Sequence, residues 1–130
     1  MATLRARIDL YSDRELLALL NGLAFASLEN LREAQERGQP LPLLYRSGVR
    51  YKRERPGKED WQLPTTTYRL QQGDCEDLAA WLCSERWLLG DDKARMFLKR
   101  VNPRLRHIQV LLGNGELEDP SARLGMRGKG

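Results

Sequence analysis

The sequence predicts an α+β fold that forms a single domain over residues 1–130. Three observations predict this class: two helical patterns in the first 90 residues, two extended segments after them, and a Gly-Asn-Gly turn that brings the chain back beside the second extended segment. Helices followed by an antiparallel meander are typical of α+β domains. A chain of 130 residues is long enough for one hydrophobic core and too short for two domains.

The first element is an amphipathic helix expected over residues 13–37. Ser12 and Glu15 have the spacing of a capping box, and Gly38 supplies the stop. Apolar and small residues recur along one stripe at helical spacing. They are Leu16, Leu20, Leu23, Ser27 and Leu31, with Leu19 and Leu28 at the margins of the stripe.

This stripe is wider than the contact that a small sheet offers to one side of a helix. A helix with one buried stripe should be polar on the opposite side, but residues 16–28 contain few polar side chains there. We therefore expect the first half of the helix to contact another chain, either a second copy or a larger assembly. The residues expected at that contact are Phe25, Ala24 and Ala26.

The middle of the chain is irregular over residues 39–64, where four prolines interrupt it. A short strand is expected within residues 49–53, and a short helix within residues 64–72. A second long helix is expected from residue 74 to residue 88 or 89, with Gly90 as its stop.

The last third of the chain predicts a small antiparallel sheet. Two strands are expected at residues 94–101 and 106–112, and residues 116–119 form the returning strand. Residues 113–115 fit a three-residue hairpin loop with glycine in the left-handed position. Residues 122–130 are rich in glycine and basic side chains, so we expect a flexible tail there.

The hairpin loop decides which side chains share a sheet face. With a three-residue loop, Gln109 faces Asp119. The side chain of His107 then lies on the same face as Asp119 and one diagonal step away, within reach of a hydrogen bond. A two-residue loop would put these two side chains on opposite faces. We therefore predict the three-residue loop.

Residues 73–79, which read Gly-Asp-Cys-Glu-Asp-Leu-Ala, are the most informative stretch. The glycine turn puts Cys75 in the first turn of the second long helix, where free amides and the macrodipole favour a thiolate. Cys83 lies in mid-helix and is expected to be a small core residue, like Trp81 and Trp87. Eight helical residues separate the cysteines by about 12 Å, which is too far for a disulfide.

Cys75, His107 and Asp119 together have the composition of an acyl-transfer site: a nucleophile, a base and a carboxylate that orients the base. Taken singly, each has an ordinary explanation. A histidine at a strand start is usually structural or exposed, and an aspartate before proline is a common turn residue. The combination favours catalysis.

Composition argues against several other classes of protein. No Cys-x-x-Cys or His-x-x-x-His pair is present, so neither a metal site nor another cofactor is expected. No apolar run approaches the roughly 18 residues of a membrane span. Residues 1–9 lack the apolar stretch of a secretory signal. The basic run at 50–55 is diluted by Glu54 and by Glu59 and Asp60, which favours a solvated face over a nucleic-acid groove.

Four segments carry a resemblance to a known family: the Trp-Gln-Leu-Pro of residues 61–64, the cysteine motif of residues 73–79, His107, and the Glu-Asp-Pro-Ser of residues 118–121. They resemble the transglutaminase-like branch of the papain-like cysteine enzymes, most closely the small single-domain forms encoded by tailed bacteriophages. The resemblance covers residues 45–126 and leaves the first helix outside the shared core.

The resemblance implies a nucleophile helix packed on a small antiparallel sheet. It assigns Cys75 as the nucleophile, His107 as the general base and Asp119 as the residue that orients the base. It also implies an oxyanion donor upstream of the cysteine. The candidates for that donor and for the cleft wall are Trp61, Gln62, Gln71 and Gln72.

The expected function is therefore a cysteine-dependent acyl transferase or amide hydrolase. In a phage setting its substrate would be peptidoglycan or a protein amide, and the chain would be made in the host cytoplasm and incorporated in the virion. The alternative is a catalytically idle structural or assembly component of a phage particle. The long first helix and the basic tail would then serve to dock other phage structural proteins.

Overall fold

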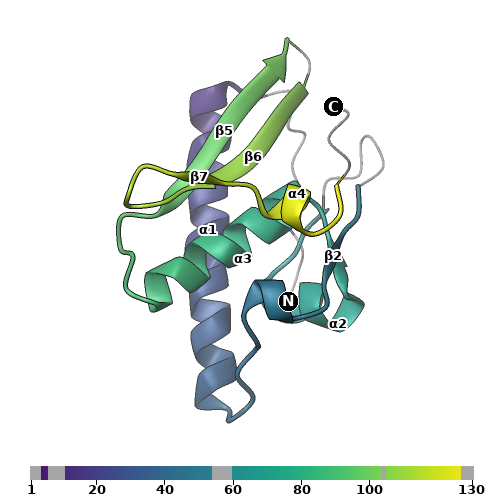
Figure 1. Cartoon of the computed structure of the whole chain (residues 1–130), viewed down its shortest axis with the longest axis vertical. Helices are drawn as coiled ribbons and strands as arrows, with labels where there is room; N and C mark the ends of the chain where they lie inside the picture. Colours follow the sequence, from purple (N-terminus) through teal and green to yellow (C-terminus); the bar gives the residue numbers. More distant parts are fainter. Residues whose placement is uncertain (1–3, 6–10, 54–59, 104, 127–130) are drawn as a thin grey trace.

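The computed structural model describes residues 4–5, 11–53, 60–103 and 105–126, and its fold is α+β, as predicted (Figure 1). Its helical elements are α1 (Asp13–Glu36), the 3₁₀ turn η2 (Leu44–Arg46), α2 (Pro64–Leu70), α3 (Cys75–Leu88) and α4 (Pro120–Arg123). Its strands are β1 (Leu4–Arg5), β2 (Arg50–Tyr51), β3 (Asp60–Trp61), β4 (Gln72–Gly73), β5 (Arg95–Asn102), β6 (Leu105–Leu111) and β7 (Leu117–Glu118).

Helix α1 begins with the predicted capping box. The backbone N–H of Glu15 donates to the Ser12 hydroxyl at 3.1 Å, and the N–H of Ser12 donates to the Glu15 carboxylate at 2.9 Å. The helix ends at Glu36, and Gly38 follows it with a positive φ of 75°. Both ends therefore agree with the sequence to within one residue.

The strands of the described residues form three separate sheets. The largest is antiparallel, in the order β5-β6-β7, and corresponds to the predicted meander. A second sheet pairs β1 with β3 in antiparallel fashion, and a third pairs β2 with β4 in parallel. The parallel pair was not predicted, because β2 and β4 are only two residues long and lie far apart in the sequence.

The three-residue hairpin loop between β6 and β7 is confirmed. Leu111 pairs with Leu117, and the N–H of Leu112 donates to the carbonyl of Glu116 at 2.8 Å. Gly115 in the loop has a φ of 92°, a conformation that glycine adopts without strain. The register that brings His107 and Asp119 to one sheet face is therefore present.

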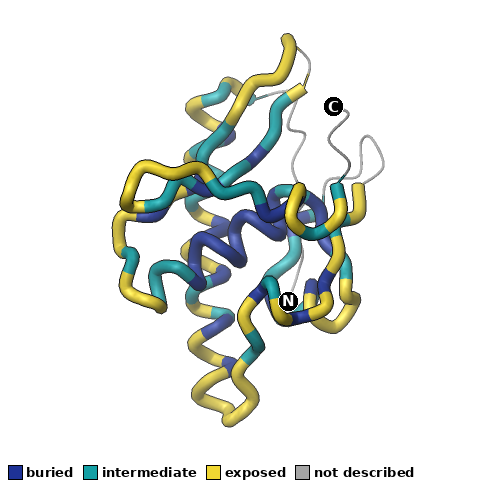
Figure 2. The backbone as a smooth tube through the Cα atoms, viewed as in Figure 1, coloured by how far each residue is buried: buried dark blue, intermediate teal, exposed yellow. Residues whose placement is uncertain are grey.

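Helix α3 packs against both α1 and the β5-β6-β7 sheet and forms the centre of the core, and α1 also contacts β5 directly (Figure 1). Every residue from Glu76 to Glu85 is buried, and Figure 2 shows this helix dark along most of its length. Its neighbours in the core include Leu20 of α1 and Ile108 and Val110 of β6. Trp81 and Cys83 are fully buried here, as predicted.

The apolar stripe of α1 is buried as predicted, but part of the predicted partner-facing surface is internal. Ala24 is completely buried in the core of the chain itself, which corrects its assignment to a contact with a partner. Phe25 is 61% exposed, and its ring stacks on Trp87 with 4.9 Å between centroids. Trp87 is half-buried, so it lies at the edge of the core rather than inside it.

The C-terminal segment is described as far as residue 126, beyond the start of the flexible tail expected from residue 122. Residues 122–126 belong to α4 or to the turn after it, and the carbonyl of Leu124 accepts from the N–H of Tyr51 at 2.9 Å. The rest of the predicted tail, residues 127–130, lies outside the described residues, as do residues 54–55 of the basic run. Among the described helices, none has the length and apolar character needed to cross a membrane.

Truncation of Leu20 to alanine should destabilise the protein by about 2–5 kcal/mol, because Leu20 is completely buried between α1 and the rest of the core. Urea unfolding followed by circular dichroism measures this change. Leu89→Ala is the matched control, since Leu89 is 61% exposed, and should change the free energy of unfolding by less than about 0.5 kcal/mol. Equal losses in the two variants would contradict the position of the core.

Candidate active site

The start of α3 is positioned by close packing at Gly73. This residue is buried, and a Cβ atom at its position would lie 3.0 Å from the Cγ2 of Thr67 and 3.2 Å from the Cβ of Asp77. A larger residue would therefore push β4 away from α2 and α3. Because Gly73 precedes Cys75 by two residues, this packing fixes the approach of the chain to the candidate nucleophile.

Two buried aspartates cap the first turn of α3. The Asp74 carboxylate accepts from the N–H of Asp77, and the Asp77 carboxylate accepts from the N–H of Asp74, both at 3.2 Å. Asp77 also accepts from the N–H of Gln62 at 2.7 Å, which ties the segment after β3 to this turn. Burial, together with the nearby charge of Asp74, raises the pKa of Asp77 well above its usual range.

The Cys75 thiol faces a carboxylate rather than a base. It is partly buried, and its Sγ donates to the Oε2 of Glu76 at 3.4 Å. Burial raises the pKa of Cys75 well above its usual range, and the charges of Glu76 and Asp74 raise it further. This corrects the expectation of a favoured thiolate: desolvation and two carboxylates outweigh the positive end of the helix.

His107 and Asp119 form a hydrogen-bonded pair. The Nε2 of His107 lies 2.9 Å from the Oδ2 of Asp119, and both side chains are half-buried. The Gln109 amide, between them on the same sheet face, also donates to Oδ2 at 3.4 Å. A carboxylate only accepts hydrogen bonds, so Nε2 carries the hydrogen and Nδ1 of the neutral ring is left as the acceptor. This is the arrangement that a general base requires.

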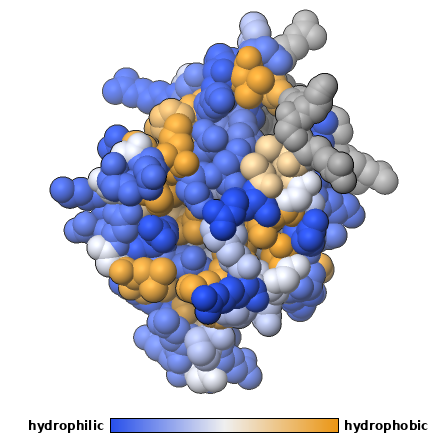
Figure 3. All heavy atoms as spheres, viewed as in Figure 1, coloured by the Kyte–Doolittle hydropathy of each residue, from blue (hydrophilic) through white to orange (hydrophobic). Residues whose placement is uncertain are grey.

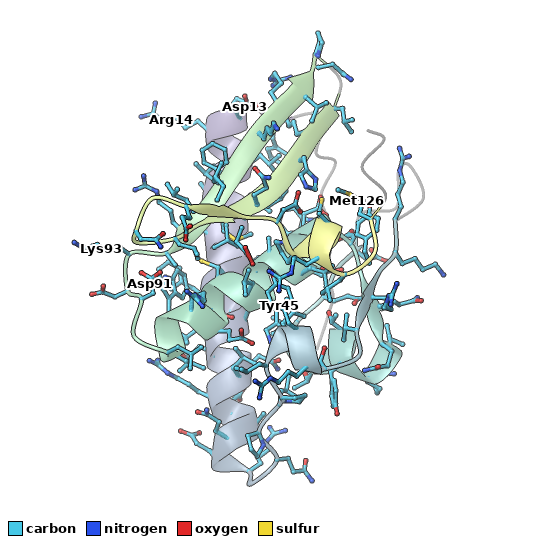
Figure 4. All side chains as sticks on the ribbon, viewed as in Figure 1. Asp13, Arg14, Tyr45, Asp91, Lys93 and Met126 are labelled. Carbon is cyan, nitrogen blue, oxygen red and sulfur yellow. The ribbon has the colours of Figure 1, made fainter. Side chains whose placement is uncertain are left out.

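The position of Asp119 is fixed by its neighbours in the chain. Its Oδ1 accepts from the N–H of Ala122 at 3.2 Å and so caps α4, while its Oδ2 holds His107. Next to it, the Glu118 carboxylate accepts from the Tyr45 hydroxyl at 2.9 Å and pairs with Arg123, whose guanidinium lies over the Tyr45 ring. Figure 4 shows Tyr45 between η2 and α4. These contacts join η2, β7 and α4 around the pair.

The sulfur of Cys75 lies beside β6, one residue along from His107. The backbone N–H of Ile108 lowers the pKa of Cys75, an effect smaller than the rise caused by burial and by the two carboxylates. Within the described part of the chain, no hydrogen bond joins Cys75 to His107, and none uses the Nδ1 of His107. The structure thus brings the predicted base and its orienting carboxylate together, with the predicted nucleophile adjacent but turned toward Glu76.

The oxyanion candidates lie around the start of α3 without pointing a donor at the sulfur. Trp61 is buried in the core, and its Nε1 has no partner among the residues that the structure describes. The side-chain carbonyl of Gln62 accepts from the Thr67 hydroxyl at 3.0 Å. Gln72 is half-buried in β4, where it pairs with Arg50, and the amide of Gln71 donates to backbone carbonyls. In the described chain, none of the four is hydrogen-bonded to Cys75.

Tyr51 is a site residue that sequence reasoning missed. It pairs with Gly73 across the parallel β2–β4 sheet, two residues before the cysteine. Burial raises the pKa of Tyr51 to about 12, and the nearby Cys75 contributes to that rise. No periodicity or motif in the sequence predicts that Tyr51 lies near Cys75, because the pairing of β2 with β4 is long-range and only two residues long.

The remaining chemistry of the site is simple. Both cysteines are free thiols, as expected. Within the described ranges, no group of three or more histidine, cysteine, aspartate or glutamate side chains is arranged to hold a metal ion. A buried carboxylate at the other end of α3, Glu85, accepts from the N–H of Leu44 at 2.7 Å and has a structural role in holding η2.

Comparison with known proteins adds nothing to this geometry: no family model, no curated protein and no solved structure matches the chain.

Alkylation of Cys75 by iodoacetamide should be slow near neutral pH and should speed up about tenfold per pH unit between pH 7 and 9. The raised pKa keeps the thiol protonated in that range, so the thiolate fraction grows with pH. Glu76→Gln removes one carboxylate charge and should raise the rate at pH 7.5. Peptide mapping by mass spectrometry separates Cys75 from the fully buried Cys83, which should react more slowly still. Fast labelling of Cys75 that is independent of pH would contradict this electrostatic account.

Proposed function

We propose that this chain is a transglutaminase-like cysteine enzyme, with its papain-like core over residues 45–126, that transfers or hydrolyses acyl groups. In the phage setting proposed from the resemblance, it would act on peptidoglycan or a protein amide and be incorporated in the virion. The observation that carries the proposal is the His107–Asp119 hydrogen bond beside the cysteine at the start of α3.

Three features support this proposal. The nucleophile helix packs against β6, the strand that carries the base. The base is oriented through Nε2, which leaves Nδ1 for a thiol proton. The backbone N–H of Ile108, the residue after His107 in β6, lowers the pKa of Cys75, which is consistent with a sulfur close to this strand.

The proposed reaction begins when the Cys75 side chain turns from Glu76 toward His107. His107 takes the thiol proton at Nδ1, and the sulfur attacks the carbonyl carbon of an amide. The backbone N–H of Cys75, free at the first turn of α3, helps to hold the resulting oxyanion. His107 then gives the proton to the leaving amine as the C–N bond breaks. Water or another amine resolves the acyl-enzyme.

Replacement of the proposed catalytic residues should abolish acyl transfer. With p-nitrophenyl acetate as the acyl donor, wild-type protein should give a burst of p-nitrophenol, and mass spectrometry should find an acetyl group on Cys75. Cys75→Ala should show neither, and His107→Ala should lose at least about a hundredfold in rate. Asp119→Asn should lose a similar factor, because the ring is no longer held in the productive tautomer.

Cys83→Ala is the matched control, since it removes a thiol of the same helix that lies in the core. It should keep the burst. A burst that survives Cys75→Ala, or acylation found on Cys83, would contradict the assignment of the nucleophile.

A second candidate function is an assembly component of a phage particle that does not use the site. Two observations favour it. The Cys75 thiol is hydrogen-bonded to Glu76 and held protonated. Phe25 presents a large apolar ring to solvent, stacked on Trp87 of α3. An exposed aromatic ring of this kind suits contact with a partner protein.

If Phe25 contacts a second copy of the chain, light scattering should find a dimer or larger species at micromolar concentration. Phe25→Glu should shift the population toward the monomer, because the contact would then bury a charge. Arg14→Glu, at an exposed position of the same helix, is the matched control and should not change the mass. A wild-type protein that is monomeric at all concentrations would contradict self-association through this helix.

A further inference from the structure

The outer face of the β5-β6-β7 sheet carries the His107–Asp119 pair, and strand register defines its other members. Lys99 lies directly opposite His107, and Phe97 lies opposite Gln109, whose side-chain amide donates to Asp119. Side chains of directly opposite residues have Cβ atoms about 4.5–5.5 Å apart. The ammonium-bearing Lys99 is therefore an immediate neighbour of the proposed base.

The same register completes this surface at its far end. Arg95 of β5 lies opposite Leu111 of β6, which faces Leu117 of β7. Arg95, Lys99 and Leu117 are exposed, and the other members of the face are half-buried. We call this surface the dyad face; its residues are Arg95, Phe97, Lys99, His107, Gln109, Leu111, Leu117 and Asp119.

Helices α1 and α3 pack on the opposite face of the sheet, so the dyad face is turned outward (Figure 1). Figure 3 views the molecule from this side. The region over β5 and β6 is largely hydrophilic, with hydrophobic side chains at its margins. The dyad face is thus a surface that a substrate can reach.

The cations of the two sheet faces differ in their partners. Arg100 and Arg106, which pair with each other across the ladder on the inner side, both form ion pairs with Asp13 at the start of α1. Arg95 and Lys99 on the dyad face form no ion pair with any described residue. The dyad face thus presents two cations that form no ion pair within the described chain, together with the Asp119 carboxylate, which is hydrogen-bonded to His107.

The spacing of these cations fits an extended chain. Arg95 and Lys99 are four residues apart on one strand, which corresponds to about 13 Å. Carboxylates on residues i and i+4 of an extended peptide have the same separation. Phe97 lies midway between Arg95 and Lys99 along the strand, level with the peptide side chain at i+2.

We propose that the dyad face binds the acyl substrate as an extended acidic peptide, with one carboxylate on Lys99 next to the scissile amide and a second on Arg95. The role of the peptide as an acyl substrate rests on the proposed acyl-transfer function. Its binding to the dyad face does not depend on that function. Lys99 and Arg95 are specificity residues in this scheme, and Phe97 contacts the apolar side chain between them.

A peptide fits the dyad face better than a nucleic acid does. Single-stranded nucleic acids are bound by several aromatic rings on which successive bases stack, within a groove of many cations. The dyad face offers one half-buried aromatic ring and two free cations. Leu111 and Leu117 instead provide aliphatic surface of the kind that contacts peptide side chains.

The test is fluorescence anisotropy with a labelled peptide containing Asp-Gly-Leu-Gly-Asp. It is compared with the same peptide in which both aspartates are replaced by asparagine, and with a labelled oligothymidylate. The protein is used as wild type and as Cys75→Ser, which prevents turnover. We expect the acidic peptide to bind more tightly than the asparagine peptide, and the difference to shrink as sodium chloride is raised.

Lys99→Gln should weaken binding of the acidic peptide about threefold, and the double variant with Arg95→Gln about tenfold. Lys93→Gln is the matched control, because Lys93 is an exposed lysine in the turn before β5 and points away from the sheet (Figure 4). It removes the same charge from the molecule and should leave binding unchanged.

Three outcomes would overturn the proposal: absent or equal binding of the two peptides, equal weakening by Lys93→Gln and Lys99→Gln, or tighter binding of the oligothymidylate. The catalytic proposal is tested separately, and it fails if Cys75 is not acylated. Acidic-peptide binding without acylation would sustain the dyad face as a peptide site and remove its catalytic role.

Discussion

The burial of α3 is the constraint on which the rest of the structure depends. Ten consecutive residues of this helix, from Glu76 to Glu85, are enclosed by α1, the sheet and the irregular segments. A helix enclosed on every side cannot leave its polar groups to water, and unpaired buried polar groups are costly. Its acidic residues are therefore matched to backbone donors. Asp77 accepts from Gln62, and Glu85 accepts from Leu44.

This enclosure also determines the chemistry of Cys75. The helix start supplies a positive potential, but it does so in a desolvated environment that already holds carboxylates. A thiol in such surroundings keeps its proton until a base approaches or the carboxylates are neutralised. The candidate nucleophile is therefore held as a protonated thiol in this structure.

Much of the fold followed from local signals. The capping box at Ser12, the glycine turn before Cys75 and the Gly-Asn-Gly loop each fix the chain within a few residues, so α1, α3 and the β6–β7 register were predicted correctly. The pairing of His107 with Asp119 followed from that register alone.

What the sequence did not reveal depends on distant parts of the chain. The parallel β2–β4 pair that brings Tyr51 to the site joins two-residue strands without periodicity. The raised pKa of Cys75 results from burial, which no single segment encodes. The inward orientation of Ala24 is set by the packing of the core, because hydrophobicity alone does not distinguish a core alanine from one at an interface.

The two oxygens of the Asp119 carboxylate have different partners. One accepts from the backbone at the start of α4, and the other is hydrogen-bonded to the imidazole of His107. The orientation of the imidazole is thereby coupled to the folding of the last helical turn, which is itself attached to β2 through Leu124 and Tyr51. An affinity tag or fusion partner joined within residues 120–126 would loosen that turn and let the carboxylate rotate. Recombinant forms of the protein should therefore carry such additions beyond Met126, or at the other end of the chain.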